Sequence, residues 1–162
     1  MIYVQAADSL AVADSLESAG RLEEYLHLLE IAAQACLENL QRGDAELSIL
    51  LADDDTIQRL NHEYLGIDAP TDVLSFPAGD TDPESGAEYL GDIIVSLPRA
   101  QAQADAGGHT VLDELQLLAV HGVLHLAGYD HDAPEHKAEM WALQAQVLTA
   151  LGCGITGPAL TE

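Results

Sequence analysis

The chain has 162 residues, of which 28 are acidic and five are lysine or arginine, so its formal net charge is −23. This charge repels polyanions at long range, which argues against binding to DNA or to an anionic membrane surface, and no apolar run approaches the length of a membrane span. The length fits one domain, and the absence of a signal-peptide pattern together with only two, widely spaced cysteines favours a cytoplasmic protein.

Hydrophobic periodicity predicts the elements in chain order, because apolar side chains recur every second residue in a half-buried strand and every three to four residues in an amphipathic helix. The expected strands cover residues 1–7, 46–52, 73–76 and 89–97. The expected helices cover residues 21–41, 57–65, a segment that starts near Pro98, 110–126 and 134–151.

Capping and helix-breaking residues define the boundaries of these elements. Ser15 and Ser18 are candidate caps of the first helix, and the acidic run 53–55 is interpreted as the cap of the second helix. Residues 78–88 are rich in glycine, aspartate and proline and predict a loop. Together the pattern predicts a single α+β domain over residues 1–152, with a small mixed sheet of about four strands packed with helices, and a loose tail over 153–162.

The histidines His121, His125 and His131 form the most informative motif in the chain. The first two lie one helical turn apart, so both rings can face one metal ion. Gly128 suits a left-handed end of the helix, which would turn the chain back and bring His131 to the same ion. Three neutral imidazoles leave a tetrahedral zinc with one open position, as in catalytic sites. We therefore expect one Zn²⁺, held on the long helix and the turn that follows it.

The same spacing occurs in the zinc signature H-E-x-x-H-x-x-G-x-x-H of the metzincin proteases. All three histidines and the glycine are in register, but Gly122 stands where those proteases have the glutamate that acts as general base. A site without this glutamate can still activate water, but it lacks the usual proton acceptor for peptide hydrolysis. The sequence therefore predicts a metal site with a chemistry different from that of a protease.

Residues 121–131, His-Gly-Val-Leu-His-Leu-Ala-Gly-Tyr-Asp-His, match the histidine signature of the YbeY family. Further blocks of the chain resemble that family, and the resemblance extends over about residues 47–152. These blocks are Leu60-Asn61 with Tyr64, the run 70–77 (Pro-Thr-Asp-Val-Leu-Ser-Phe-Pro), Leu90-Gly91-Asp92-Ile93 with Ser96, and Glu139-Met140.

The resemblance implies a cytoplasmic, zinc-dependent endoribonuclease that acts on single-stranded RNA. It implies a role in maturation of small-subunit ribosomal RNA, especially the 16S 3′ end, and in ribosome quality control. The implied partners are ribosomal RNA and the small ribosomal subunit or its proteins, and the implied zinc ligands are His121, His125 and His131. No side chain is assigned as catalytic; the nucleophile would be a zinc-bound water.

One position departs from the family pattern. Many members have an arginine after the tyrosine of the second block, next to the active-site cleft, and here that residue is Leu65, for which Arg59 is a poor geometric substitute. This loss and the acidity of the chain keep two alternatives open: a non-catalytic, zinc-stabilised ribosome assembly factor, and a metzincin-like peptide or amide hydrolase, against which Gly122 argues.

Other polar residues receive more ordinary interpretations. Asp130 can hydrogen-bond a ligand imidazole or simply form the turn, and Glu114 fits helix N-terminal charge better than a proton acceptor. His136 is the reserve ligand. Arg99 is the cation expected to border the cleft. The remaining histidines are expected on the surface, and the two large aromatics in the core; these residues are His27, His62, His109, Tyr89 and Trp141.

The scarcity of lysine beside so many carboxylates raises a hypothesis of adaptation to high salt. At about 1 M salt the Debye length falls to about 3 Å, so that repulsion between the carboxylates is screened. Lys137 is the single lysine of the sequence. Folding that depends on salt would support this hypothesis.

Overall fold

The computed structural model describes residues 1–11, 16–81, 83–84 and 86–157. Within these ranges strands and helices are mixed along the first part of the chain, and three helices follow the last strand. In chain order they are β1 (Ile2–Ala6), α1 (Asp8–Ala11), α2 (Leu16–Asn39), β2 (Glu46–Ala52), α3 (Asp54–Leu65), β3 (Val73–Thr81), β4 (Glu88–Ser96), α4 (Leu97–Gly107), α5 (Val111–Leu126) and α6 (Pro134–Ala150).

The sheet in the described residues has four strands in the order β1-β2-β4-β3. β1, β2 and β4 run parallel, whereas β3 pairs antiparallel with β4 at the edge, with Val73 opposite Val95 and Pro77 opposite Gly91. Parallel neighbours need crossover connections, and α2 and α3 lie in these connections. The predicted α+β fold with a small mixed sheet is confirmed.

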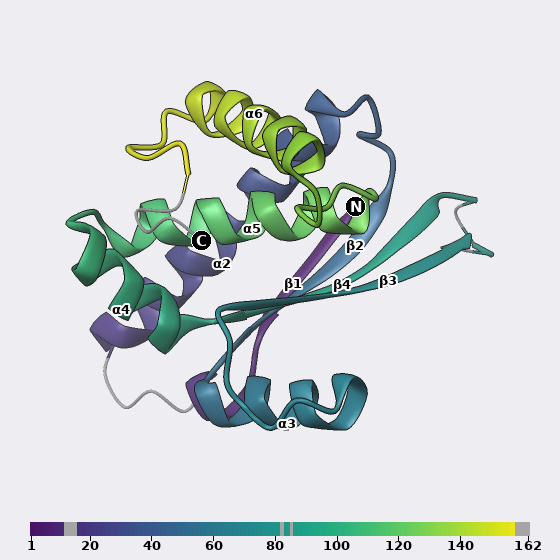
Figure 1. The fold of residues 1–162 in the computed structure, drawn as a ribbon. Helices are drawn as coiled ribbons and strands as arrows, with labels where there is room; N and C mark the ends of the chain where they lie inside the picture. The colour runs from purple at the N-terminus through teal and green to yellow at the C-terminus, as the bar shows by residue number, and fades with distance from the viewer. Residues whose placement is uncertain (12–15, 82, 85, 158–162) are drawn as a thin grey trace.

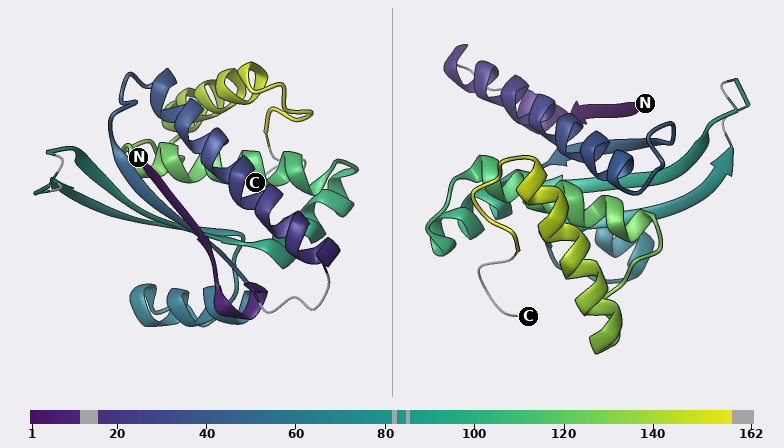
Figure 2. Two further views of the ribbon diagram at one scale, coloured as in Figure 1. Left: turned by 180° about the vertical axis from the view of Figure 1, so that it is seen from behind. Right: turned by 90° about the horizontal axis from the view of Figure 1, so that it is seen from above.

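The helices cover the two faces of the sheet unequally. α2, α4, α5 and α6 lie on one side, and α3 with the short α1 lies on the other, while the outer ends of β3 and β4 extend beyond the helices (Figures 1 and 2). The buried side chains follow the same division, because one large cluster joins α2, α5, α6 and the sheet, and a separate small cluster consists of Ala52, Ile57, Leu74 and Ile94.

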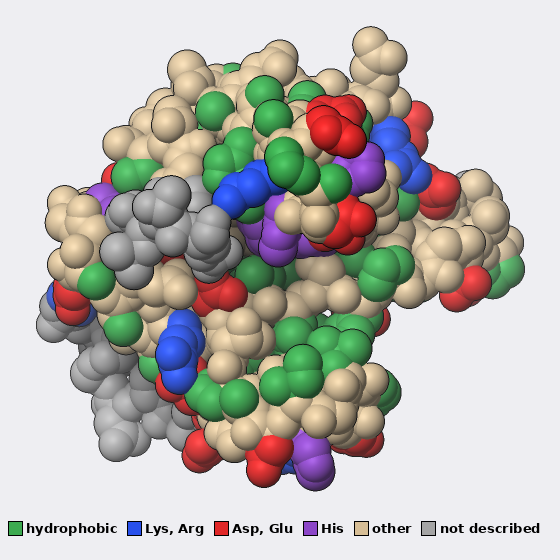
Figure 3. All heavy atoms as spheres, viewed as in Figure 1, with side chains coloured by type: hydrophobic (Ala, Val, Ile, Leu, Met, Phe, Trp, Pro, Cys, Tyr) green, Lys and Arg blue, Asp and Glu red, His purple; other side chains and the backbone are tan. Residues whose placement is uncertain are grey.

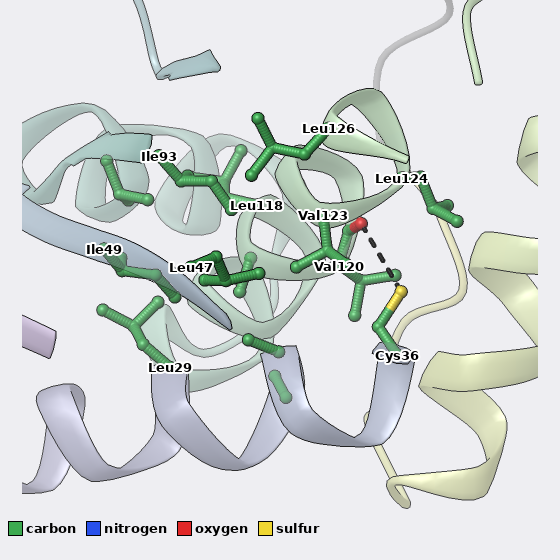
Figure 4. Close-up of a cluster of buried hydrophobic side chains, with 14 of the residues drawn as sticks. Leu29, Cys36, Leu47, Ile49, Ile93, Leu118, Val120, Val123, Leu124 and Leu126 are labelled. Carbon is green, nitrogen blue, oxygen red and sulfur yellow. Dashed lines mark hydrogen bonds between the residues drawn. The ribbon is translucent and has the colours of Figure 1, made fainter. Parts of the chain in front are cut away.

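Helix α5 is the central element of the large cluster. Its mean hydropathy is high for a helix in a soluble fold, and almost every residue from Glu114 to Leu126 is buried, because α2, α4, α6 and the sheet all pack around it. Figure 4 shows Val120 of α5 beside Cys36 of α2, whose Sγ lies 4.0 Å from the Val120 carbonyl oxygen. A helix buried on several sides gives a rigid base for any functional side chain that it carries.

Several predicted boundaries were wrong. β3 continues through Pro77 to Thr81 and β4 starts at Glu88, so residues 78–81 and 88 of the predicted loop 78–88 belong to the arms of a hairpin. Proline is tolerated there because β3 is an edge strand, where a missing N–H breaks no inner ladder. α2 begins at Leu16 rather than residue 21, which places Ser18 inside it, and α1 was not predicted. Ser15 lies outside the described residues.

The described residues after α6 contact the rest of the domain. The backbone N–H of Gly154 donates to Oδ1 of Asp113 at 3.1 Å, and Ile155 packs against the large cluster. Residues 158–162 lie outside the described part of the chain, so the domain limit at 152 stays a prediction. Among the described residues no helix is long and apolar enough to cross a membrane.

Candidate metal centre

His121 and His125 project from the last two turns of α5. Thr110 caps the start of this helix by accepting a hydrogen bond from the N–H of Asp113, and the four-residue spacing places the two rings on one face. Their Nε2 atoms lie 3.1 Å apart. Two nitrogen ligands of a tetrahedral zinc lie about 3.3 Å apart if each Zn–N bond is about 2.0–2.1 Å, so the observed spacing is close to that of a shared ion.

The turn after α5 brings the third histidine to the same place. Gly128 has φ of 101°, and the N–H of Tyr129 donates to the carbonyl of Leu124 at 3.0 Å, which closes the end of the helix. One potential ligand atom from each of His121, His125 and His131 lies within 4.8 Å of the others. The two helical rings are partly buried, whereas His131 is exposed. The predicted turn geometry is therefore present.

The electrostatic environment favours the neutral form of the two helical imidazoles. Burial lowers the pKa of His121, more than its hydrogen bond to Gln144 and the charge of Asp72 raise it. Burial and then the neighbouring histidines lower the pKa of His125. A neutral imidazole has the free lone pair that a metal ligand needs. The donor set of three imidazoles therefore fits a first-row metal ion such as zinc.

Helix α6 packs against the group of three histidines, with contacts to His121 and His131. Nδ1 of His121 lies 3.0 Å from Oε1 of Gln144, whose side chain is completely buried. The ring of Trp141 contacts His121 and His131 edge-on, with centroids 5.7 Å apart in both cases. The ammonium of Lys137 lies 5.4 Å from the centroid of the Trp141 ring, so the chain's single lysine is close to the centre.

The rings open into a cleft of about 630 Å³ between α5 and the start of β3. Figure 3 shows histidines along the upper rim of a hollow and hydrophobic side chains along its lower rim. Asp72 lines the cleft, and its carboxylate accepts hydrogen bonds from the N–H of Val73 and from the amide of Gln103. The metal centre is thus accessible, with a carboxylate held in a fixed position nearby.

Close packing explains the glycine between the first two histidines. A Cβ on Gly122 would lie 2.8 Å from Cγ2 of the fully buried Ile93, so α5 approaches β4 more closely than any side chain at this position would allow. The carbonyl of Gly122 also accepts a hydrogen bond from Ser75 of β3 at 3.3 Å. The backbone has no room here for the glutamate of a metzincin.

The other residues singled out in the sequence lie as follows. Oδ1 of Asp130 accepts the backbone N–H of His131 at 2.7 Å, the turn-forming contact, and its role beside an imidazole stays a prediction. His136 is exposed and pairs with Asp132 at 2.8 Å, outside the group of three. Arg99 pairs with Asp54 at 3.5 Å, and it is Gln103, one turn later on α4, that reaches Asp72.

The prediction that His109 lies on the surface was wrong. Its Nε2 lies 2.6 Å from Oε1 of Glu114, and these side chains are 8% and 5% exposed, respectively. Burial raises the pKa of Glu114, against the opposing effect of His109. The pair joins the loop before α5 to the first turn of this helix. The carboxylate of Glu114 is therefore engaged with His109 rather than free to act as a proton acceptor.

Sequence reasoning missed Gln144 and the contacts of Trp141. A signal for Gln144 was present, because it occupies the apolar stripe of α6 between Met140 and Leu148, and a polar side chain in such a stripe needs a buried partner. Trp141 was interpreted as a core residue; it is half-buried and packs on two of the three histidines.

These observations define a class: a small α+β protein whose central helix and following turn hold a three-histidine metal-binding group in an open cleft. A model of the family described as endoribonuclease YbeY matches residues 14–152. The chain belongs to the YbeY endoribonuclease family.

Individual relatives agree with this assignment. The chain is 45% identical over 139 residues to the endoribonuclease YbeY of Moorella thermoacetica, covering 80% of this chain and 88% of that protein. It is 49% identical over 133 residues to the endoribonuclease YbeY of Salinispora tropica, covering 76% and 85%. A solution structure of a Thermotoga maritima protein matches with a TM-score of 0.54 and 26% identity, over 96% of this chain and 95% of that one.

Proposed function

We propose that this protein is a zinc-dependent endoribonuclease that cuts single-stranded RNA, matures the 3′ end of 16S ribosomal RNA and takes part in ribosome quality control in the cytoplasm. The observation that carries the proposal is the group of three imidazoles at the mouth of a cleft of about 630 Å³, in a chain whose relatives are endoribonucleases. The protein would bind its RNA substrate together with the small ribosomal subunit or proteins of that subunit.

Each part of the chain has a stated role in this proposal. His121, His125 and His131 would hold one zinc ion, which when bound supplies a Lewis acid for a phosphodiester and its attacking water. Partial burial lowers the pKa of His121 and His125, which favours the neutral form that a metal ligand needs. β3 forms one wall of the cleft, and this wall would orient the RNA. β3 is held against α5 because the hydroxyl of Ser75 donates a hydrogen bond to the carbonyl of Gly122.

Charge gives little help with binding RNA. Arg42 pairs with Glu88 and Arg99 pairs with Asp54, so these two guanidinium groups are already engaged with carboxylates. Leu65, which is 53% exposed, replaces the arginine of many relatives. We therefore expect weak binding to long RNA, with a shallow dependence on salt, and a need for ribosomal partners to localise the substrate.

The test combines metal analysis with cleavage of RNA. Protein purified without added metal should contain zinc, and it should cut a single-stranded RNA that spans the mature 16S 3′ end but leave a duplex of the same sequence intact. His121→Ala should lose both the metal and the cleavage. His136→Ala, which alters an exposed histidine outside the group, is the matched control and should retain both.

The two alternatives make different predictions in the same experiment. Leu65 and the net charge of −23 favour a zinc-stabilised assembly factor without catalysis; in that case His121→Ala would lose zinc, yet 16S maturation in cells would continue whenever the variant folds. A peptide or amide hydrolase is disfavoured by the packing of Gly122 against Ile93, and cleavage of unstructured peptides but not of RNA would be needed to revive it.

A further inference from the structure

The side chain of Gln144 is the least ordinary feature around the three histidines. It is completely buried on α6, and its Oε1 lies 3.0 Å from Nδ1 of His121. Its Nε2 is also buried, and no hydrogen-bond partner for it is found among the described residues. A buried amide with an unsatisfied donor lowers stability, so such a group is retained where it has another use.

The direction of the hydrogen bond follows from the chemistry of the two groups. A carbonyl oxygen can only accept, so Nδ1 of His121 must donate its proton to Oε1 of Gln144. In a neutral imidazole this leaves Nε2 of His121 without a proton. That atom lies 3.1 Å from Nε2 of His125, on the side where the three ligand atoms converge.

The opposite orientation of the amide would spoil the site. If the Gln144 side chain were turned over, its NH₂ group would donate to Nδ1, and the proton of the neutral His121 ring would move to Nε2. The ring would then point an N–H at the place where the ion must bind. The orientation that suits a metal ion is thus the one that leaves Nε2 of Gln144 without a partner.

We propose that Gln144 is a positioning residue that fixes the Nδ1–H tautomer and the ring orientation of His121, so that its Nε2 is ready to bind the metal. This role rests on the proposed metal site and specifies how α6 contributes to it. A buried acceptor behind a ligand imidazole usually changes metal affinity by roughly 10- to 100-fold.

Two substitutions of similar size separate positioning from packing. Gln144→Leu keeps the bulk of the side chain but removes the acceptor, whereas Gln144→Glu keeps the acceptor and removes the unsatisfied NH₂ group. Gln146→Leu makes the same change at an exposed glutamine two residues later on α6 and serves as the control. Thermal unfolding of the metal-free proteins verifies that each variant folds.

The first measurement is the affinity of the metal-free proteins for zinc, by equilibrium competition with a chromophoric chelator. Gln144→Leu should bind zinc roughly 10- to 100-fold more weakly than the wild type, while Gln144→Glu should bind at least as tightly and Gln146→Leu should be unchanged. Equal affinities of the wild type and Gln144→Leu would overturn the role of Gln144 alone. A wild-type protein that takes up no zinc would overturn the metal site and this role with it.

The second measurement needs no metal. Long-range ¹H–¹⁵N spectra of the imidazole nitrogens should show His121 of the metal-free wild type and of Gln144→Glu as the Nδ1–H tautomer. In Gln144→Leu the Nε2–H form should become populated. A residue that acts only through packing would leave the tautomer unchanged in Gln144→Leu, and that result would contradict the proposal even if zinc affinity fell.

Discussion

The two faces of the sheet differ in how many hydrophobic side chains they bury and in how many they expose to the solvent. The face covered by α2, α5 and α6 buries the large hydrophobic cluster and carries the histidines. The face covered by α3 buries only four side chains in its cluster, and exposes Tyr64, Leu65 and Ile67 around the end of that helix. The group of three histidines thus lies on the heavily packed face, and Leu65 lies on the lightly packed one.

The largest expected effect concerns Gly91, where β4 passes close to α5. Its φ is 141°, and an added Cβ would overlap the carbonyl oxygen of Phe76 and press on Leu126 at 3.0 Å. Gly91→Ala should lower the free energy of unfolding by about 4 kcal/mol, the sum of backbone strain and overpacking. Gly79→Ala, also at positive φ but with nothing within 4 Å, should cost about 1 kcal/mol. Urea unfolding measures both; equal losses would show that the close contacts with Phe76 of β3 and Leu126 of α5 add nothing to the backbone strain.

A matched pair of core substitutions compares the faces directly. Ile49 belongs to the large cluster and Ile57 to the small one, and both are at most 1% exposed. Ile49→Ala should destabilise by about 4 kcal/mol and Ile57→Ala by about 2 kcal/mol, because a lightly packed helix can move to fill the space. Urea unfolding with a constant m-value provides the comparison. A greater loss for Ile57→Ala would reverse the ranking of the two faces.

The face with the metal centre should also respond to pH. The pKa values of His121 and His125 are lowered from 6.5 by burial, so below pH 6.5 the unfolded chain takes up protons that the folded chain resists. Their contribution to stability is therefore present above pH 6.5 and is lost as the pH falls through the lower folded values. Urea unfolding in the presence of a chelator should show this decline.

Two variants sharpen the pH measurement. His125→Gln removes one of the resisting groups and should flatten the decline below pH 6.5. The carboxylate of Asp132 raises the pKa of His136, which acts in the opposite direction, so His136→Gln should make the decline steeper. A metal-free protein whose stability rises on acidification across this range would contradict the burial of the two ligand rings.

The smallest effect is expected on the lightly packed face. Leu65→Arg introduces the cation that the resemblance to the family leads us to expect at this position, and it should increase affinity for single-stranded RNA about two- to fivefold at low salt and steepen the dependence on salt by about one charge. Ile31→Arg, at a position on α2 that is 43% exposed compared with 53% for Leu65, adds the same charge elsewhere. Fluorescence anisotropy compares them, and an equal gain in both variants would mean that only net charge matters.

The sequence predicted most of this structure because its signals are local. The periodicity of 110–126 and Gly128 indicated the helix and the turn that bring the three histidines together. The strands on either side of the hairpin were predicted, but the extension of β3 beyond Phe76 was missed, because this outer arm lacks large apolar side chains and depends on pairing between strands rather than on periodicity. Gln144 and the pair His109–Glu114 could not be placed, since their roles depend on which distant segments pack against them.

The contact between Gln144 of α6 and His121 of α5 has a consequence for synthesis of the chain, which proceeds from the N-terminus. The first two histidines lie on α5, the third on the turn after it, and the glutamine that orients the first ring on the last helix. A chain that is synthesised from its N-terminus can complete this centre only after α6 has emerged. A product that stops before α6 would contain all three histidines, yet it would lack Gln144, the group that prepares His121 for a metal ion. His121 is thus prepared for a metal ion only once α6 has packed against α5.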